Sequence, residues 1–372
     1  MDEKSNAAVT VSFLALILLF FTVADLMGSN RLYSETENRM LAVKPEFSWE
    51  AVLDGSYMED YEAYVTDQFV SRDTWVELKT RGDILLQKKE INGVYLGKDD
   101  YLIEQHKPGD ISEEQVDKKI TLLEKLVKKY GAKAMLVPTA DNVLTDKLPF
   151  QAQYYDQRAF LDQVSDAIGE ENLIDVYDTL KAHAEEEIYY RTDHHWTSLG
   201  AYYGYLKWNS QMGGTAVETF DIGSMQSVTE EFLGTLHSKI NLPNKEDSIQ
   251  IFTETLHHIP TITYDFATRS HSYYERKYLD TKNKYGYFLD DNHGFIEIET
   301  GYRRGRELVL IKDSYANCFV PLLANHYDKI YMVDLRYYNG ALSGLIDGYI
   351  TPQTDVLVLY DCIHFIEDFQ YY

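Results

Sequence analysis

Residues 307–334 read ELVLIKDSYANCFVPLLANHYDKIYMVD, and this stretch decides the fold. Two apolar runs, at 307–311 and 329–334, flank a segment at 316–327 that suits a helix. Apolar strands separated by a helix are typical of parallel strands that helices cover on both faces. The stretch therefore predicts a strand-helix-strand unit of an α/β protein.

The same alternation continues on both sides of this unit. Ser112 and Gln115 form a capping box, Gly131 ends the helix that follows, and AKAMLVP reads as a buried strand. We also expect a helix at about 160–168, a short strand NLID, a short helix around 342–346 and a strand DVLVLY. Together they predict a doubly wound, mostly parallel sheet.

We place this α/β domain at residues 106–372. Residues 212–305 break the alternation with many Tyr, Thr and charged residues. We expect them to be a Tyr-rich insertion of loops and short strands.

An apolar segment lies near the N-terminus. Residues 5–24 carry no charge and are long enough for one bilayer crossing. A cleaved signal peptide is the alternative, but the run is long, one Lys precedes it, and no Ala-x-Ala site follows. We expect an uncleaved anchor at 1–30, with the rest of the chain outside the cytoplasm as a hypothesis. Residues 31–105 are expected to form a helical stalk that packs on the main domain and ends in a small hairpin.

Charge and cysteine content exclude some classes of function. The 372 residues carry a formal net charge of −25, which repels nucleic-acid phosphates and anionic lipid headgroups. We expect no nucleic-acid partner. The two cysteines, Cys318 and Cys362, lack the paired spacing of zinc sites and disulfide frameworks, so a bridge between them is neither predicted nor excluded.

Polar residues follow the predicted strands at their carboxyl ends, where open α/β sheets bind ligands. Asp313 and Ser314 lie at a strand-to-helix turn, where a hydroxyl can face outward and helix amides can stabilise an oxyanion. The alternative is that one of the two only caps the helix. The next two strand ends bring Asp334, Arg336, Tyr337 and Tyr338, and then Asp361 and His364.

The stretch TDHHW at 192–196 supplies a base for this serine. Thr197 or Ser198 can cap the following helix, which leaves the three polar residues in the loop before it. Asp193 and His195, two apart, can point to one side, while His194 faces the other. A hydroxyl needs a base, and the base needs an orienting group. The sequence therefore predicts a Ser-His-Asp triad that requires no cofactor.

A metal site is the alternative reading of the same loop. Asp-His-His offers ligand atoms, which Asp313, Asp334 or His326 could complete. Neighbouring histidines rarely converge on one ion, and no second cluster has a His-x-x-x-His spacing. We expect no metal.

Several motifs together resemble a known family. They are TDHHW, INGVYLGKDDYLIE at 91–104, VPTADNVLTDKLP at 137–149, KYGYFLDDNH at 284–293, and IKDSYANCFVPLLANHYDKIYMVDLRYY at 311–338. With them the chain resembles the DHHW family of bacterial, anchored, SGNH-hydrolase-like proteins, which are similar to alginate and cellulose O-acetyltransferases. The resemblance covers nearly all of the chain after the anchor.

The resemblance implies a permuted SGNH order, with Asp-x-His before the nucleophile. It assigns Asp193 as the orienting group, His195 as the base and Ser314 as the nucleophile. It also suggests that Trp196 shapes the site, that Asn292 donates to the oxyanion, and that Arg336 and Tyr337 contact sugar or acetyl. A core position for the tryptophan, and a salt-bridge or packing role for the last two residues, are the alternatives.

The function implied is extracytoplasmic O-acetyl transfer through an acetyl-serine to a polysaccharide. A polytopic membrane O-acyltransferase is the expected acetyl donor, because no acetyl-CoA pool exists outside the membrane. A polysaccharide acetylesterase and a non-catalytic glycan-binding or scaffold subunit are the alternative functions.

Overall fold

The computed structural model describes residues 3–28, 30–34, 39–212 and 219–370. The chain divides into two compact units. The first comprises Met1–Lys88 with Ser238–Leu242, and the second comprises Lys89–His237 with Pro243–Tyr372. All candidate site residues belong to the second unit.

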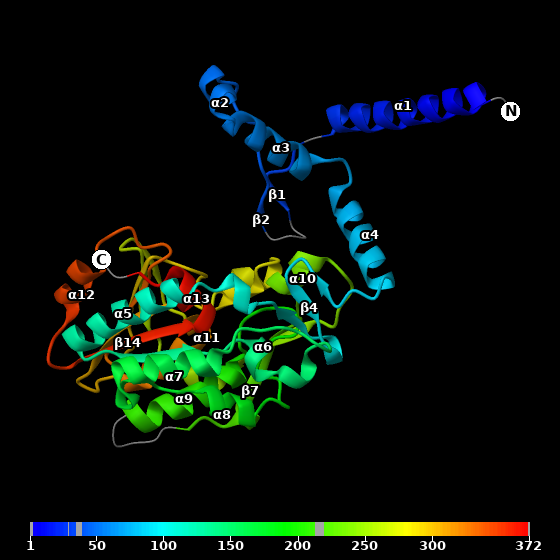
Figure 1. The fold of residues 1–372 in the computed structure, drawn as a ribbon. Helices are drawn as coiled ribbons and strands as arrows, with labels where there is room; N and C mark the ends of the chain where they lie inside the picture. Colours follow the sequence, from blue (N-terminus) through cyan, green and yellow to red (C-terminus); the bar gives the residue numbers. More distant parts are fainter. Residues whose placement is uncertain (1–2, 29, 35–38, 213–218, 371–372) are drawn as a thin grey trace. The chain divides into compact units, whose positions relative to one another are not determined.

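The first unit is mostly helical. Its elements are α1 (Glu3–Met27), β1 (Tyr33–Ser34), β2 (Arg39–Met40), α2 (Trp49–Asp54), α3 (Ser56–Gln68) and α4 (Arg72–Leu85) (Figure 1). Arg39 donates two hydrogen bonds to Asp67, which also accepts the N–H of Ala42 at 2.8 Å and so holds the segment after β2 against α3. Ser71, at the N-cap position of α4, has a left-handed φ of 54° and makes no side-chain capping bond.

Helix α1 contains the apolar segment. Ala7–Ala24 is long and apolar enough to cross a membrane, and it is the one such helix among the described residues. None of this segment is buried. The segment is thus compatible with the expected single-pass anchor, of which residues 1, 2 and 29 lie outside the described residues.

The second unit is built on a seven-stranded sheet with the order β10-β9-β11-β13-β12-β14-β6. Strands β13, β12, β14 and β6 run parallel, and β10, β9 and β11 pair antiparallel at one end. The strands are β6 (Lys133–Val137), β9 (Thr261–Tyr264), β10 (Thr268–Ser270), β11 (Phe295–Glu299), β12 (Glu307–Lys312), β13 (Lys329–Asp334) and β14 (Thr354–Asp361). The expected parallel core of an α/β sheet is confirmed.

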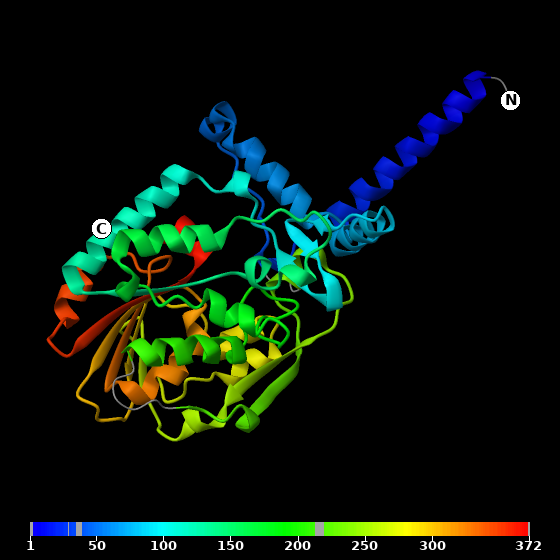
Figure 2. The same ribbon diagram turned by 60° about the horizontal axis from the view of Figure 1, so that its bottom comes forward.

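Helices cover both faces of this sheet (Figure 2). In β12, Leu308 and Leu310 face one apolar core, and Val309 and Ile311 face the other. The first core includes α9 (Ser198–Met212) and α11 (Ala316–Leu323); the second includes α5 (Glu113–Tyr130), α7 (Gln157–Ile168), α12 (Leu342–Tyr349) and α13 (Cys362–Asp368). Burial on both faces explains why the parallel strands are continuous apolar runs.

Shorter elements complete the chain. They are β3 (Glu90–Ile91), β4 (Val94–Leu96), β5 (Leu102–Glu104), α6 (Ala140–Val143), α8 (Tyr177–Ala182), β7 (Met225–Phe232), α10 (Thr235–Ile240) and β8 (Asp247–Phe252). The hairpin of β4 and β5 belongs to the second unit, although it was expected to end the helical stalk. Cys318 and Cys362 are both free, buried thiols.

The region expected as an insertion contributes to the main sheet. Strands β9, β10 and β11 extend the sheet beyond β13, while β7 and β8 form a separate antiparallel pair. Residues 213–218 of this region lie outside the described residues. The last four residues of β11, IEIE, alternate apolar and acidic residues, which suits a strand with one buried face.

Two smaller expectations also change. NLID forms only an isolated bridge between Leu173 and Ala134 rather than a strand. Ser112 accepts the N–H of Gln115 at 3.4 Å, but the Gln115 amide reaches the carbonyl of Ile366 instead of closing the capping box. Gly131 ends α5 with a φ of 63°, as expected.

Candidate active site

The loop before α9 is fixed through its backbone. Asp247 on β8 accepts the N–H groups of Arg191 at 2.9 Å and Thr192 at 2.8 Å. Thr197 accepts the N–H of Gly200 at 3.2 Å and so caps α9, as the sequence predicted. The side chains between these anchors therefore project from a loop that is held at both ends.

Ser314 lies in the turn between β12 and α11. Asp313 shapes this turn, because one of its oxygens accepts the N–H of Tyr315 at 2.9 Å and the other accepts the N–H of Asp361 at 2.8 Å. Helix α11 has no side-chain cap. The serine hydroxyl is thus not used for capping, which was the alternative to a catalytic role.

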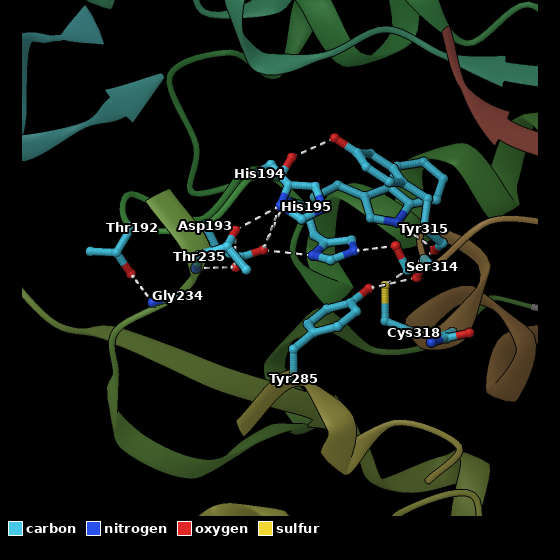
Figure 3. Close-up of polar contacts among 12 residues, drawn as sticks. Thr192, Asp193, His194, His195, Gly234, Thr235, Tyr285, Ser314, Tyr315 and Cys318 are labelled. Atoms are coloured by element: carbon cyan, nitrogen blue, oxygen red, sulfur yellow. Dashed lines mark hydrogen bonds and ion pairs between the residues drawn. The ribbon is translucent and has the colours of Figure 1, made fainter. Parts of the chain in front are cut away.

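The structure brings Asp193, His195 and Ser314 together (Figure 3). His195 Nδ1 lies 2.6 Å from Asp193 Oδ1, and His195 Nε2 lies 2.7 Å from Ser314 Oγ. An ionised carboxylate only accepts hydrogen bonds, so Nδ1 carries the ring hydrogen and Nε2 presents its lone pair to the serine hydroxyl. This arrangement allows His195 to take the serine proton.

The surroundings of Asp193 favour its ionised form. Oδ1 also accepts the backbone N–H of His195, and Oδ2 accepts the N–H of Thr235 at 2.8 Å and its hydroxyl at 3.0 Å. Burial acts to raise the pKa of Asp193, but the positive charges that His194 and His195 carry when protonated, together with these hydrogen bonds, hold it well below its usual range. A Cβ on Gly234 would lie 2.3 Å from the Asp193 side chain, so only glycine fits there.

The His195 ring lies between two other rings. The Tyr285 ring stacks on it with centroids 3.8 Å apart and an interplanar angle of 11°, and the His194 ring lies 3.9 Å away. The Tyr285 hydroxyl also donates to the carbonyl of Ser314 at 3.2 Å. Burial lowers the pKa of His194 to about 4, so this ring brings no positive charge against His195 at neutral pH.

Two further hydrogen bonds join the loop to the turn. Trp196 Nε1 donates to the carbonyl of Tyr315 at 2.9 Å, and the Tyr315 hydroxyl donates to the carbonyl of His194. Trp196 was expected to shape the site, with a core position as the alternative. It has no exposed surface, as a core residue would have, and its indole N–H links the loop to the turn that carries Ser314.

The remaining predicted residues make no hydrogen bond to the triad within the described part of the chain. Arg336 makes a bidentate ion pair with Asp334 at 2.9 and 2.7 Å, which is the structural alternative to a sugar contact. Tyr337 is 51% exposed, with the Arg336 guanidinium 5.5 Å from its ring. Asn292, the expected oxyanion donor, donates its side-chain N–H to Asp291 at 3.2 Å and accepts a hydrogen bond from Asn317 at 3.3 Å.

A cavity of about 240 Å³ adjoins the triad, lined by His194 and Tyr315 among others. Asp361 and His364 at the end of β14 also line it and form an ion pair with each other.

The charge of Asp361 raises the pKa of His364 to about 10. Burial and then the charge of Asp361 raise the pKa of Asp313 to about 7.

Two side-chain groups among the described residues bring three metal-ligand atoms within 4.8 Å of one another. They are Asp193, His194 and His195, and Asp313, Asp361 and His364. In both groups a carboxylate and an imidazole already pair at hydrogen-bond distance. The other suggested ligands have partners elsewhere: His326 bonds the Tyr205 hydroxyl at 2.7 Å, and Asp334 pairs with Arg336.

Thr235, Asp247 and Tyr285 also contact the loop or the triad, and none of them was predicted as a site residue. Tyr285 lies within KYGYFLDDNH, a stretch that already contributed to the family resemblance. Thr235 and Asp247 lie among irregular polar segments and had no pattern to mark them.

A sequence model of the family described as "DHHW protein" matches residues 88–333. Among solved structures, a DHHW family protein from Eubacterium siraeum DSM 15702 is 22% identical with a TM-score of 0.60, over 76% of this chain and 97% of that chain. Bacillus cereus PatB1 with a sulfonyl adduct is 19% identical with a TM-score of 0.58, over 74% of this chain and 100% of that chain. At these identities the likeness shows a shared fold. No curated protein sequence matches the chain.

Proposed function

Because this chain belongs to the DHHW family, we propose that it is a serine O-acetyltransferase that acts through an acetyl-Ser314 intermediate. The proposed acceptor is a hydroxyl of a cell-surface or secreted polysaccharide. The observation that carries the proposal is the continuous hydrogen-bond chain from Asp193 through His195 to Ser314, at 2.6 and 2.7 Å. The sulfonyl adduct in the similar PatB1 structure adds support, because sulfonylation is typical of an activated nucleophile.

The proposed reaction has two halves. His195 takes the proton of Ser314 as the hydroxyl attacks the acetyl carbonyl, and Asp193 stabilises the imidazolium. The proton then passes to the leaving group of the donor, which leaves acetyl-serine. In the second half a sugar hydroxyl attacks this ester with His195 as base, and the serine is restored.

The backbone N–H of Ser314 is the proposed oxyanion donor. It makes no hydrogen bond to any described residue and lies in the turn that leads into α11. A donor of this kind stabilises charge that develops in the tetrahedral intermediate. This mechanism uses no metal or organic cofactor.

The proposed location follows from α1. We infer a single-pass membrane anchor at Ala7–Ala24, with the catalytic unit outside the cytoplasm. A polytopic membrane O-acyltransferase would then supply the acetyl group from inside. The anchor would keep the chain close to this donor.

Transfer of labelled acetyl tests the proposal. The full chain in detergent is incubated with labelled 4-nitrophenyl acetate and oligosaccharides, and the label is followed to sugar or to free acetate. We expect sugar esters that depend on Ser314, with Ser210→Ala, an exposed serine on α9, as the matched control. Label only in free acetate would indicate the acetylesterase. Unchanged transfer by Ser314→Ala would leave only the non-catalytic alternative.

A further inference from the structure

We propose that the cavity beside the triad binds a saccharide unit that carries hydroxyl or ammonium groups and no carboxylate. This inference rests on the proposed function, because the bound sugar would be the acceptor of the acetyl group. Its test is a binding measurement, which does not require that transfer occur.

The position of the cavity suits an acceptor site. It lies beyond the carboxyl ends of two neighbouring strands, because Thr139 follows β6 and Asp361 ends β14. Ligands of open α/β sheets bind in this place. Its lining residues His194 and Tyr315 are the chain neighbours of the proposed base and nucleophile, and Figure 3 shows them around the triad.

The polar groups of the cavity are held in fixed orientations. Its three histidines each bond through Nδ1: His106 to Asp141 at 3.0 Å, His194 to Thr235 at 2.8 Å, and His364 to Asp361. These bonds leave the Nε2 atoms of His194 and His364 for other contacts, while Nε2 of His106 lies 3.9 Å from a Glu104 carboxylate oxygen. Such preorganised groups, with the Thr139 hydroxyl nearby, suit the hydroxyls of a sugar ring.

Apolar side chains complete the wall. Ile111, Leu236 and Ile363 line the same cavity together with the ring of Tyr315. A sugar ring presents apolar C–H faces and a polar rim, which matches a site with both kinds of lining.

The charge of the cavity lining distinguishes acidic sugars from neutral and amine-bearing ones. The lining has four carboxylates, from Glu104, Asp110, Asp361 and Glu367, against three imidazoles, and no Lys or Arg among the described residues. Even with every imidazole protonated the lining would not be net positive, and the low pKa of His194 makes it more negative. A uronic acid would therefore be repelled, while an amine-bearing sugar would be attracted.

Binding of three tetrasaccharides to the full-length Ser314→Ala protein tests this inference. The probes are a glucosamine tetramer with free amines, cellotetraose and tetragalacturonate, measured by isothermal titration calorimetry in detergent. We expect the first two to bind and the third to have a Kd at least about tenfold higher than that of the glucosamine tetramer. Equal binding of tetragalacturonate, or no binding by any probe, would overturn the inference.

Two variants in the Ser314→Ala background locate the site. Ile111→Trp should fill the cavity and abolish binding, whereas Ile259→Trp, at a position 75% exposed and outside the cavity, should not. Glu367→Lys should lower the Kd for tetragalacturonate at least about threefold, with Glu230→Lys on β7 as control. Since Glu367 is exposed, this pair remains informative if Ile111→Trp does not fold. Unchanged binding in a folded Ile111→Trp or Glu367→Lys variant would contradict the proposed site.

The two proposals fail separately. Acetylation of Ser314 by 4-nitrophenyl acetate in the wild-type protein needs no sugar. Acetyl-serine without sugar binding would refute the acceptor site alone. Sugar binding without acetyl-serine would refute the catalytic proposal alone.

Discussion

Asp193→Asn should strongly slow catalysis by reversing the tautomer of His195. Each carboxylate oxygen of Asp193 faces hydrogen-bond donors, with Thr235 on one side and His195 on the other. An amide keeps only one acceptor oxygen. The shorter backbone contact, to the Thr235 N–H at 2.8 Å rather than the His195 N–H at 3.1 Å, favours the oxygen on the Thr235 side. The NH₂ group then faces His195 Nδ1, whose hydrogen moves to Nε2 and points at the serine.

The expected loss follows from this geometry. With a hydrogen on Nε2, His195 cannot accept the proton of Ser314, and acylation should slow roughly 10⁴-fold, as in other triads with a reversed tautomer. The mismatched buried donors should also lower the free energy of unfolding by about 1–3 kcal/mol. The burst of 4-nitrophenolate from 4-nitrophenyl acetate measures the first effect, and urea unfolding measures the second.

Asp247→Asn is the matched control. Asp247 is also a buried carboxylate that accepts backbone N–H groups, from Arg191 and Thr192, but it does not touch His195. This variant should lose stability and keep its burst rate within about tenfold of wild type. The reasoning is refuted if folded Asp193→Asn keeps a burst rate within tenfold of the wild-type protein.

Three further changes have defined outcomes. Tyr285→Leu should slow acylation about 2- to 30-fold in stopped-flow measurements, because an imidazolium on His195 loses the aromatic face against it, and Tyr285→Phe should not. Asp361 raises the pKa of His364 to about 10, so this pair stabilises the fold fully below about pH 6.5 and loses that effect as pH rises to about 10. The melting temperature should therefore fall more over this range in wild type than in His364→Gln, and equal falls would contradict the pairing. Trp196→Phe should lower the free energy of unfolding by about 1–3 kcal/mol and leave the sugar Kd unchanged, since the ring is buried; a weaker sugar affinity would contradict this core position.

The parallel half of the sheet could be predicted because its signal is local. The runs ELVLI, KIYMVD and DVLVLY fall within β12, β13 and β14, and their continuous apolar character reflects burial on both faces. The antiparallel end could not be predicted in this way. Strand β11 joins β9, which begins 34 residues earlier, and β13, which begins 34 residues later, and its own pattern does not specify either partner.

The residues of the proposed triad could be named from the sequence because an Asp-x-His before a helix and a Ser after a strand fit an orienting group, a base and a nucleophile. Helix capping and metal binding were the alternative uses of the same groups. Thr235 was missed because it lies 42 residues from Asp193, and only the folded chain brings the two together. For Trp196 and Arg336 the sequence allowed a structural role as well as a role in the site. It could not show that Trp196 donates to the backbone of the turn after β12, or that Arg336 pairs with Asp334.

The central claim is that Ser314 is a nucleophile activated by His195. Intact-protein and peptide mass spectrometry after incubation with 4-nitrophenyl acetate tests this claim most directly. We predict one acetyl group on Ser314, none in Ser314→Ala, and almost none in His195→Ala. Acetylation at other residues only, or equal labelling of Ser314 in His195→Ala, would contradict it.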